Sequence, residues 1–183
     1  SRPSNRQPQF EDLPAPPAGV TTPSFVPDGY RGLDWEVFRV GSSGPLQRLL
    51  PNGVNFAVTG TSSSASLAAL APTKSIDPLY VFLACYTNAV GGNGATPQQC
   101  TITATATTKT GTKLSVAFEY VPPGPLVAGV AVNPSQVQKK TFPSTWKNVA
   151  RLDFQITKSS TPAVGTVSTS GMAIDDFTFV SNT

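Results

Sequence analysis

The stretch that decides the fold is Gly171-Met172-Ala173-Ile174-Asp175-Asp176-Phe177-Thr178-Phe179-Val180. Its pattern predicts a β-strand that carries two carboxylates between apolar residues. Side chains alternate along a strand, so Asp175, Phe177 and Phe179 are expected on one face. If the two phenylalanines face the core, Asp175 is buried with them. A buried carboxylate then requires a cation, a set of hydrogen-bond donors or a raised pKa.

A shorter version of this pattern, Gln9-Phe10-Glu11-Asp12-Leu13, lies near the start of the chain. The same alternation places Asp12 on the face of Phe10. We expect these first and last strands to lie side by side and close the domain, which would bring Asp12 and Asp175 together.

The composition is typical of a β-rich extracellular protein. Charged residues make up 13% of the 183 residues, while Ser, Thr, Gly and Pro are abundant. The formal charge of +3 does not indicate nucleic-acid binding, because the basic residues are scattered and the pair Lys139-Lys140 has no interleaved aromatic residues. The sequence predicts no nucleic-acid partner.

The two cysteines, Cys85 and Cys100, flank a Gly- and Asn-containing loop. A disulfide between them would close a loop of about 15 residues and stabilise the fold by about 3 kcal/mol in the chain-entropy model. Pairing would place the protein in an oxidising compartment, and the alternative is two buried free thiols. A zinc site is not expected, since the chain has no CxxC spacing and no histidine.

The chain shows no apolar run of membrane-spanning length and no charged-then-apolar leader. We therefore expect a mature secreted protein without a membrane span, located outside the cell, with the cell wall as one candidate location. Residues 1–9 are polar and are expected to form a flexible arm with little structure of its own. Residues 10–183 are expected to form a single β-sandwich domain.

Several short strands separated by Gly and Pro, without a long helix, predict an antiparallel β-sandwich. Trp35, in an expected strand over 33–38, is interpreted as a core residue rather than as a binding platform. A helical turn is expected only in the Ser- and Ala-rich stretch that ends at Pro72. The remaining expected strands span 54–58, 79–85, 150–156 and a hairpin, 101–108 with 113–120.

In this order, the motifs resemble a group of secreted fungal β-sandwich proteins related to bacterial exported proteins with PEP-CTERM tails. That group runs from F-D-D-L through Y-x-G-L-x-W to a final D-D/N-F/L-T-F. The likeness covers about residues 10–180, and it departs at Glu11, in the Pro-rich connection over 121–143 and in the absence of a PEP-CTERM tail. The matching segments are Phe10-Glu11-Asp12-Leu13, Tyr30-Arg31-Gly32-Leu33-Asp34-Trp35 and Asp175-Asp176-Phe177-Thr178-Phe179.

Such domains are similar to the galactose-binding-like jelly rolls used as carbohydrate-binding modules, where a structural Ca²⁺ often joins the first and last strands. Ca²⁺ binds six to eight oxygens, which carboxylates from two strands and loop carbonyls would supply. The resemblance therefore implies Asp12 and Asp175 as first ligands, with Glu11 and Asp176 as alternates. In the other interpretation, Asp175 accepts hydrogen bonds, for example from Tyr30, without any metal.

The absence of histidine excludes a histidine general base and a Ser-His-Asp triad. A glycosidase needs only two carboxylates, so a carbohydrate-active enzyme is kept as a third hypothesis beside the two given below. Its candidate acid and base pairs are Asp34/Glu36 and Glu11/Asp176.

The preferred hypothesis is a secreted, non-catalytic module that binds a cell-wall or surface glycan. The alternative is a structural or interaction protein of the cell surface, an adhesin, effector or self-assembling subunit, whose partner is another surface protein or a second copy paired through the N-terminal arm. Sugar contacts would come from exposed aromatic and amide side chains, for which the candidates are Tyr86, Asn88, Asn93, Tyr120 and Trp146 with Asn148.

Overall fold

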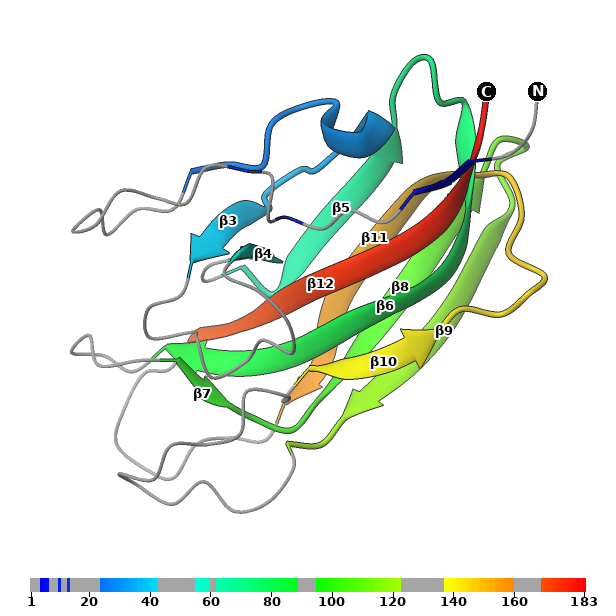
Figure 1. Ribbon diagram of the computed structural model, residues 1–183. Coiled ribbons are helices and arrows are strands. Elements are labelled where there is room, and N and C mark those ends of the chain that lie inside the picture. Colours follow the sequence, from blue (N-terminus) through cyan, green and yellow to red (C-terminus); the bar gives the residue numbers. More distant parts are fainter. Residues whose placement is uncertain are drawn as a thin grey trace.

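The chain folds into β-strands in the computed structural model shown in Figure 1. The structure describes residues 4–6, 10, 13, 24–42, 55–59, 62–88, 95–122, 137–159 and 169–183. The first elements are β1 (Ser4–Arg6), the 3-10 turn η2 (Tyr30–Gly32), β2 (Leu33–Asp34), β3 (Arg39–Ser42), β4 (Asn55–Val58), β5 (Ser64–Ala69) and β6 (Ser75–Asn88). They are followed by β7 (Ala95–Pro97), β8 (Cys100–Thr108), β9 (Lys113–Tyr120), β10 (Gln138–Thr141), β11 (Val149–Ser159) and β12 (Thr169–Asn182).

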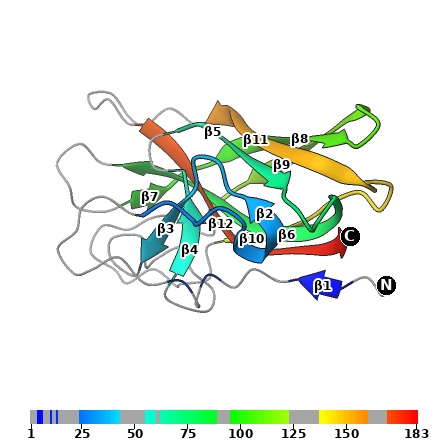
Figure 2. The same ribbon diagram turned by 90° about the horizontal axis from the view of Figure 1, so that it is seen from above.

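The twelve strands of the described residues belong to one antiparallel sheet that curls into two layers. The central path runs β2-β5-β11-β6-β12-β4-β3, with β8 and β9 extending from β11, and β10 and β7 pairing with β6. Figures 1 and 2 show β5, β11, β8 and β9 in one layer and β6, β12 and β10 in the other. The two layers are joined where β11 pairs with β6 at Val149 and Ile76. The predicted all-β, antiparallel fold is confirmed.

The core is a cluster of aromatic rings between the layers. Phe142, just after β10, lies 6.4 Å from the ring of Phe154 on β11 and 6.1 Å from that of Phe177 on β12. Trp35 is 2% exposed, and its indole N–H donates to the carbonyl of Tyr30 at 3.0 Å. The interpretation of Trp35 as a core residue is therefore confirmed.

The last strand does not follow the simple alternation that its sequence suggests. Asp176 has φ 43°, and the register of β12 against β6 shifts between Asp175 and Thr178. A bulge of this kind reverses which face the following side chains occupy. Asp175 pairs opposite the half-buried Phe82, while Phe177 contacts the core ring of Trp35. Asp175 is buried as predicted, but the shared face with Phe177 and Phe179 is a prediction that the bulge corrects.

The N-terminal segment differs from the expected first strand. The Leu13 N–H donates to the Phe10 carbonyl at 3.0 Å, a contact that two residues three apart in an extended strand do not make. The N-terminal strand that pairs with β12 is instead β1, from the segment expected to have little structure, with Asn5 opposite Val180. An N-terminal strand therefore lies beside the last strand as expected, but it is formed by Ser4–Arg6 and not by the segment around Phe10. The division at residue 10 stays a prediction.

Three further local predictions are corrected by tertiary pairing. The strand expected over 33–38 ends at Asp34, because a turn follows in which Val37 has φ 70° and is exposed. The stretch expected to form a helical turn is strand β5, whose Ala65 and Leu67 are buried against the other layer. Strand β10, inside the expected Pro-rich connection, was not predicted.

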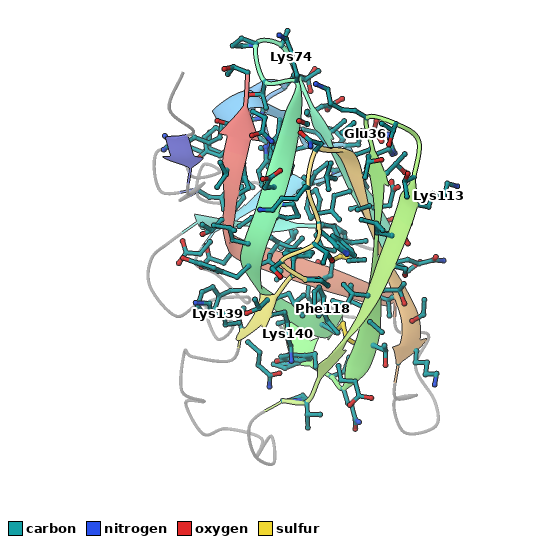
Figure 3. The ribbon with its side chains drawn as sticks, turned by 90° about the vertical axis from the view of Figure 1, so that its right-hand side faces the viewer. Glu36, Lys74, Lys113, Phe118, Lys139 and Lys140 are labelled. Carbon is teal, nitrogen blue, oxygen red and sulfur yellow. A yellow bond between two sulfur atoms is a disulfide. The ribbon has the colours of Figure 1, made fainter. Side chains whose placement is uncertain are left out.

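The hairpin and the disulfide agree with the sequence. Strands β8 and β9 pair along their length around a turn at Gly111, which has φ 83°. Figure 3 shows the two faces of β9: Lys113 projects from the molecule, while Phe118 lies among the interior side chains. Cys85 and Cys100 form the predicted disulfide. In the part of the chain that the structure describes, no helix is long and apolar enough to cross a membrane.

Candidate functional site

The outer side of the layer β5-β11-β8-β9 presents an ordered set of short polar side chains. On β8, Ile102, Ala104 and Ala106 are fully buried, so the alternate threonines point away from the core. Strands β5, β11 and β9 alternate in the same way. We call this surface the hydroxyl face, and its hydroxyl-bearing members are Ser64, Ser66, Thr101, Thr103, Thr105, Thr107, Ser115 and Thr157.

The pairing of the strands arranges these side chains in rows. One row across the four strands consists of Ser66, Asp153, Thr105 and Ser115. The next row consists of Ser64, Gln155, Thr103 and Ala117. Neighbouring strands lie about 4.8 Å apart and alternate residues of one strand about 6.7 Å apart, so the face carries polar groups on a regular two-dimensional grid.

Some of these groups are already held in place by contacts across the strands. The hydroxyls of Thr103 and Thr157 lie 3.0 Å apart. Threonine is also stiff about χ1, because two heavy atoms branch at Cβ. The hydroxyls of Thr103 and Thr157 are therefore held in place before any ligand arrives.

One end of the hydroxyl face is organised by Arg151 of β11. Its guanidinium donates to both carboxylate oxygens of Glu36, at 3.2 and 2.9 Å, and its Nε donates to Asp153 at 2.8 Å. Ser66 joins the group, since its hydroxyl accepts from Arg151 at 2.7 Å and donates to Asp153 at 2.7 Å. The hydrogen bonds to Glu36 and then to Asp153 raise the pKa of Arg151. The three charged side chains thus satisfy one another at the surface.

A carboxylate pair for hydrolysis is not favoured by this arrangement. Burial, followed by the negative charges of Asp28 and Glu36, raises the pKa of Asp34. Glu36, however, is bound in bidentate fashion by Arg151 and is not free to act as a base. Of the other predicted pair, Glu11 lies outside the described residues.

The predicted calcium ligands are only partly described. Asp175 is buried and accepts the backbone N–H of Asp176 at 2.9 Å, so it does accept a backbone hydrogen bond, though from its own neighbour. Glu11 and Asp12 lie outside the described residues. Among the described side chains, no group of three or more Asp, Glu, Cys or His converges. Those residues alone do not provide a calcium site, and calcium stays a prediction that requires further oxygens, such as those of Glu11 or Asp12.

The aromatic residues predicted to contact sugar are packed inside the protein. Tyr86, Tyr120 and Trp146 are all at most 3% exposed, so their rings cannot stack on an external sugar in this structure. The hydroxyl of Tyr120 is buried and has no hydrogen-bond partner among the described residues, and burial raises the pKa of that phenol. Asn93 lies outside the described residues, as does the side chain of Asn88, whose backbone pairs in β6.

Asn148, the predicted companion of Trp146, has a structural role. Its backbone N–H donates to Asp77 on β6 at 2.9 Å. Asp77 also accepts from the amide of Asn182 on β12 at 3.0 Å and pairs with Lys147 at 3.2 Å. This cluster ties together the ends of strands from both layers and was not predicted.

A second surface, on the outer side of β6, is less suited to sugar. Tyr80 and Phe82 are half-buried there, with ring centroids 6.1 Å apart. The ammonium of Lys139 lies 3.8 Å from the centroid of Tyr80 and occupies one face of that ring. An open aromatic platform is therefore not presented by this pair.

The hydroxyl face could have been suspected from one signal in the sequence, the strict alternation Thr101-Ile-Thr-Ala-Thr-Ala-Thr-Thr108. The alternation identified a strand but not its neighbours, which supply Arg151, Gln155 and Ser66. No protein-family model matches the chain, and no curated protein is found to be similar to it.

Proposed function

We propose that this protein is a secreted, non-catalytic module that binds glycan through the hydroxyl face. The observation that carries the proposal is the register-matched set of hydroxyl, amide and carboxylate groups across four strands. A sugar hydroxyl both donates and accepts hydrogen bonds, and serine and threonine hydroxyls do the same. Gln155, exposed in the middle of the face, adds a donor and an acceptor in one side chain.

Two further observations support this proposal. The disulfide between Cys85 and Cys100 is of the kind that persists in oxidising compartments, which favours secretion. The binding of Glu36 by Arg151 favours recognition over hydrolysis, because a general base must be free to take a proton.

The proposal is tested with the labelled protein on an array of soluble and immobilised glycans. Binding should weaken at least tenfold when Thr103→Val and Thr105→Val are combined, since these changes remove two hydroxyls but keep the branched shape. Thr141→Val is the matched control, because Thr141 is an exposed strand threonine of β10 in the other layer. Failure to bind any glycan, or equal binding by all three proteins, would refute the assignment.

The alternative function, association with a second copy or another surface protein, is favoured by one observation. Strand β1 has three residues and pairs along the edge of β12 beyond the part that pairs with β4. Such an arm can exchange between two chains, because the same backbone hydrogen bonds form in either case. Light scattering after gel filtration tests this: a concentration-dependent dimer should disappear on deletion of residues 1–9. A monomer at every concentration would count against exchange.

A further inference from the structure

We infer that the glycan recognised by the hydroxyl face is a neutral polysaccharide in packed form, with chains side by side, rather than a single soluble chain. This inference rests on the proposed function and specifies its ligand class.

The shape of the face carries the first part of the inference. The rows run across β5, β11, β8 and β9, so the grid extends as far across the strands as along them. The outward residues of β5 and β8 are all short, namely serine, alanine and threonine. The outward positions of the four strands hold no aromatic residue to clamp one sugar ring. A ligand that repeats in two directions can contact every row at once.

The charges on and around the face favour a neutral ligand. Arg151 pairs with both Glu36 and Asp153, which leaves one net negative charge at that end. The exposed Lys158, opposite Thr101, carries a positive charge toward the other end and balances it. On β9, Lys113 and Glu119 carry opposite charges near the two ends of the strand. An acidic polysaccharide would need a surface of one positive sign, and a basic one the reverse.

The energetics of hydroxyl contacts favour a packed ligand over a single chain. Each hydrogen bond to sugar replaces one to water, so its net contribution is small. A single chain that lies along one row makes few such bonds and loses its own freedom of motion on binding. A packed surface presents many chains that are already fixed, and the protein that has formed one contact is held near all the others. The restricted χ1 of threonine favours the same outcome, because less side-chain freedom is lost on binding.

The experiment compares one protein on two forms of the same polymer. Retention is measured on microcrystalline cellulose and on chitin powder, and binding of the corresponding soluble hexasaccharides is measured by titration calorimetry. The solid form should be bound at least tenfold more tightly than the hexasaccharide. The combined Thr103→Val and Thr105→Val variant should lose at least tenfold on the solid, whereas Thr141→Val should bind like the parent.

A second variant, Thr105→Lys, places a long side chain in the centre of the grid and should abolish retention by lifting the surfaces apart. Melting curves of all variants identify any change that comes from unfolding. Equal affinity for the hexasaccharide and the solid would overturn this inference while leaving the proposed function in place. Absence of binding to either form and to the glycan array would overturn both. Inhibition of ice growth without retention on any polysaccharide would also overturn the inference, because the surface of ice is a two-dimensional lattice of water molecules that offers the same hydrogen-bonding groups.

Discussion

Reduction of the disulfide between Cys85 and Cys100 should destabilise the domain without abolishing the fold. The bond joins the buried end of β6 to the first residue of β8 and closes a loop with a sequence separation of 15. In the chain-entropy model a loop of about 15 residues restricts the unfolded chain by about 3 kcal/mol. Because small domains have urea m-values of about 1–3 kcal/mol/M, the unfolding midpoint should fall by about 1–3 M.

The loop is short enough for the native contacts around it to survive reduction. Strand β7 pairs with β6 inside the loop, and the N–H of Gln98 donates to the carbonyl of Cys85 at 3.0 Å. The reduced protein should therefore keep its strands and its buried tryptophans at low urea. The effect of reduction should fall on the midpoint rather than on the native spectrum.

Urea unfolding with and without reductant, followed by tryptophan fluorescence, measures this effect. Trp35 and Trp146 are both buried, so unfolding should shift their emission to longer wavelength. The combined Cys85→Ala and Cys100→Ala variant is the control, because its midpoint should not respond to reductant. Oxidised and reduced midpoints that coincide within about 0.3 M would refute the reasoning, since the unfolded chain would then gain no freedom from the broken bond.

Four other predictions follow from single side chains. Burial raises the pKa of Asp77, but the hydrogen bonds from its three partners outweigh burial and lower that pKa below the ordinary 3.8. The stabilisation from this carboxylate is therefore present above about pH 4 and is lost as the pH falls further. Asp77→Asn should cost about 1–3 kcal/mol at pH 7, and its difference from the parent should vanish in unfolding curves measured in acid. Val37→Gly should stabilise by about 1 kcal/mol, a rise in Tm of about 2–4 °C by calorimetry, because a β-branched residue at φ 70° is strained. Phe142→Ala should lower the free energy of unfolding by about 3–5 kcal/mol in urea, whereas Phe25→Ala, at a ring that is 60% exposed, should change it by less than about 1 kcal/mol. Millimolar Ca²⁺ should raise the Tm of the EDTA-treated protein but not that of Asp175→Asn, and an equal response of the two would remove Asp175 from the ligands.

The sequence predicted the strands whose pattern is purely local. The hairpin of β8 and β9 is visible because threonine and apolar residues alternate on both sides of a turn that contains Gly111. The burial of Trp35 and Asp175 was predicted from their apolar neighbours. These features depend on a residue and its nearest neighbours in the chain, which is why they could be read without a structure.

The sequence failed where distant pairing overrides local preference. The Ser- and Ala-rich segment of β5 has no strong preference for strand, and it is extended because β11 and β2 pair with its two edges. The four residues of β10 are a strand for the same reason, since they pair with β6. The bulge at Asp176 is likewise a shift in register between β12 and β6. It could not be predicted from the alternation of residues along β12 alone.

The candidate site shows the same division. The threonines of β8, the two cysteines and the absence of histidine are properties of the sequence, and they determined an all-β, disulfide-linked protein without histidine chemistry. Only the tertiary structure decided that Tyr86 and Trp146 are core residues and that Ser66, Arg151 and Thr105 share one face. Alternation determines that a strand has two faces, whereas packing against the second layer decides which face is buried and which is left to bind.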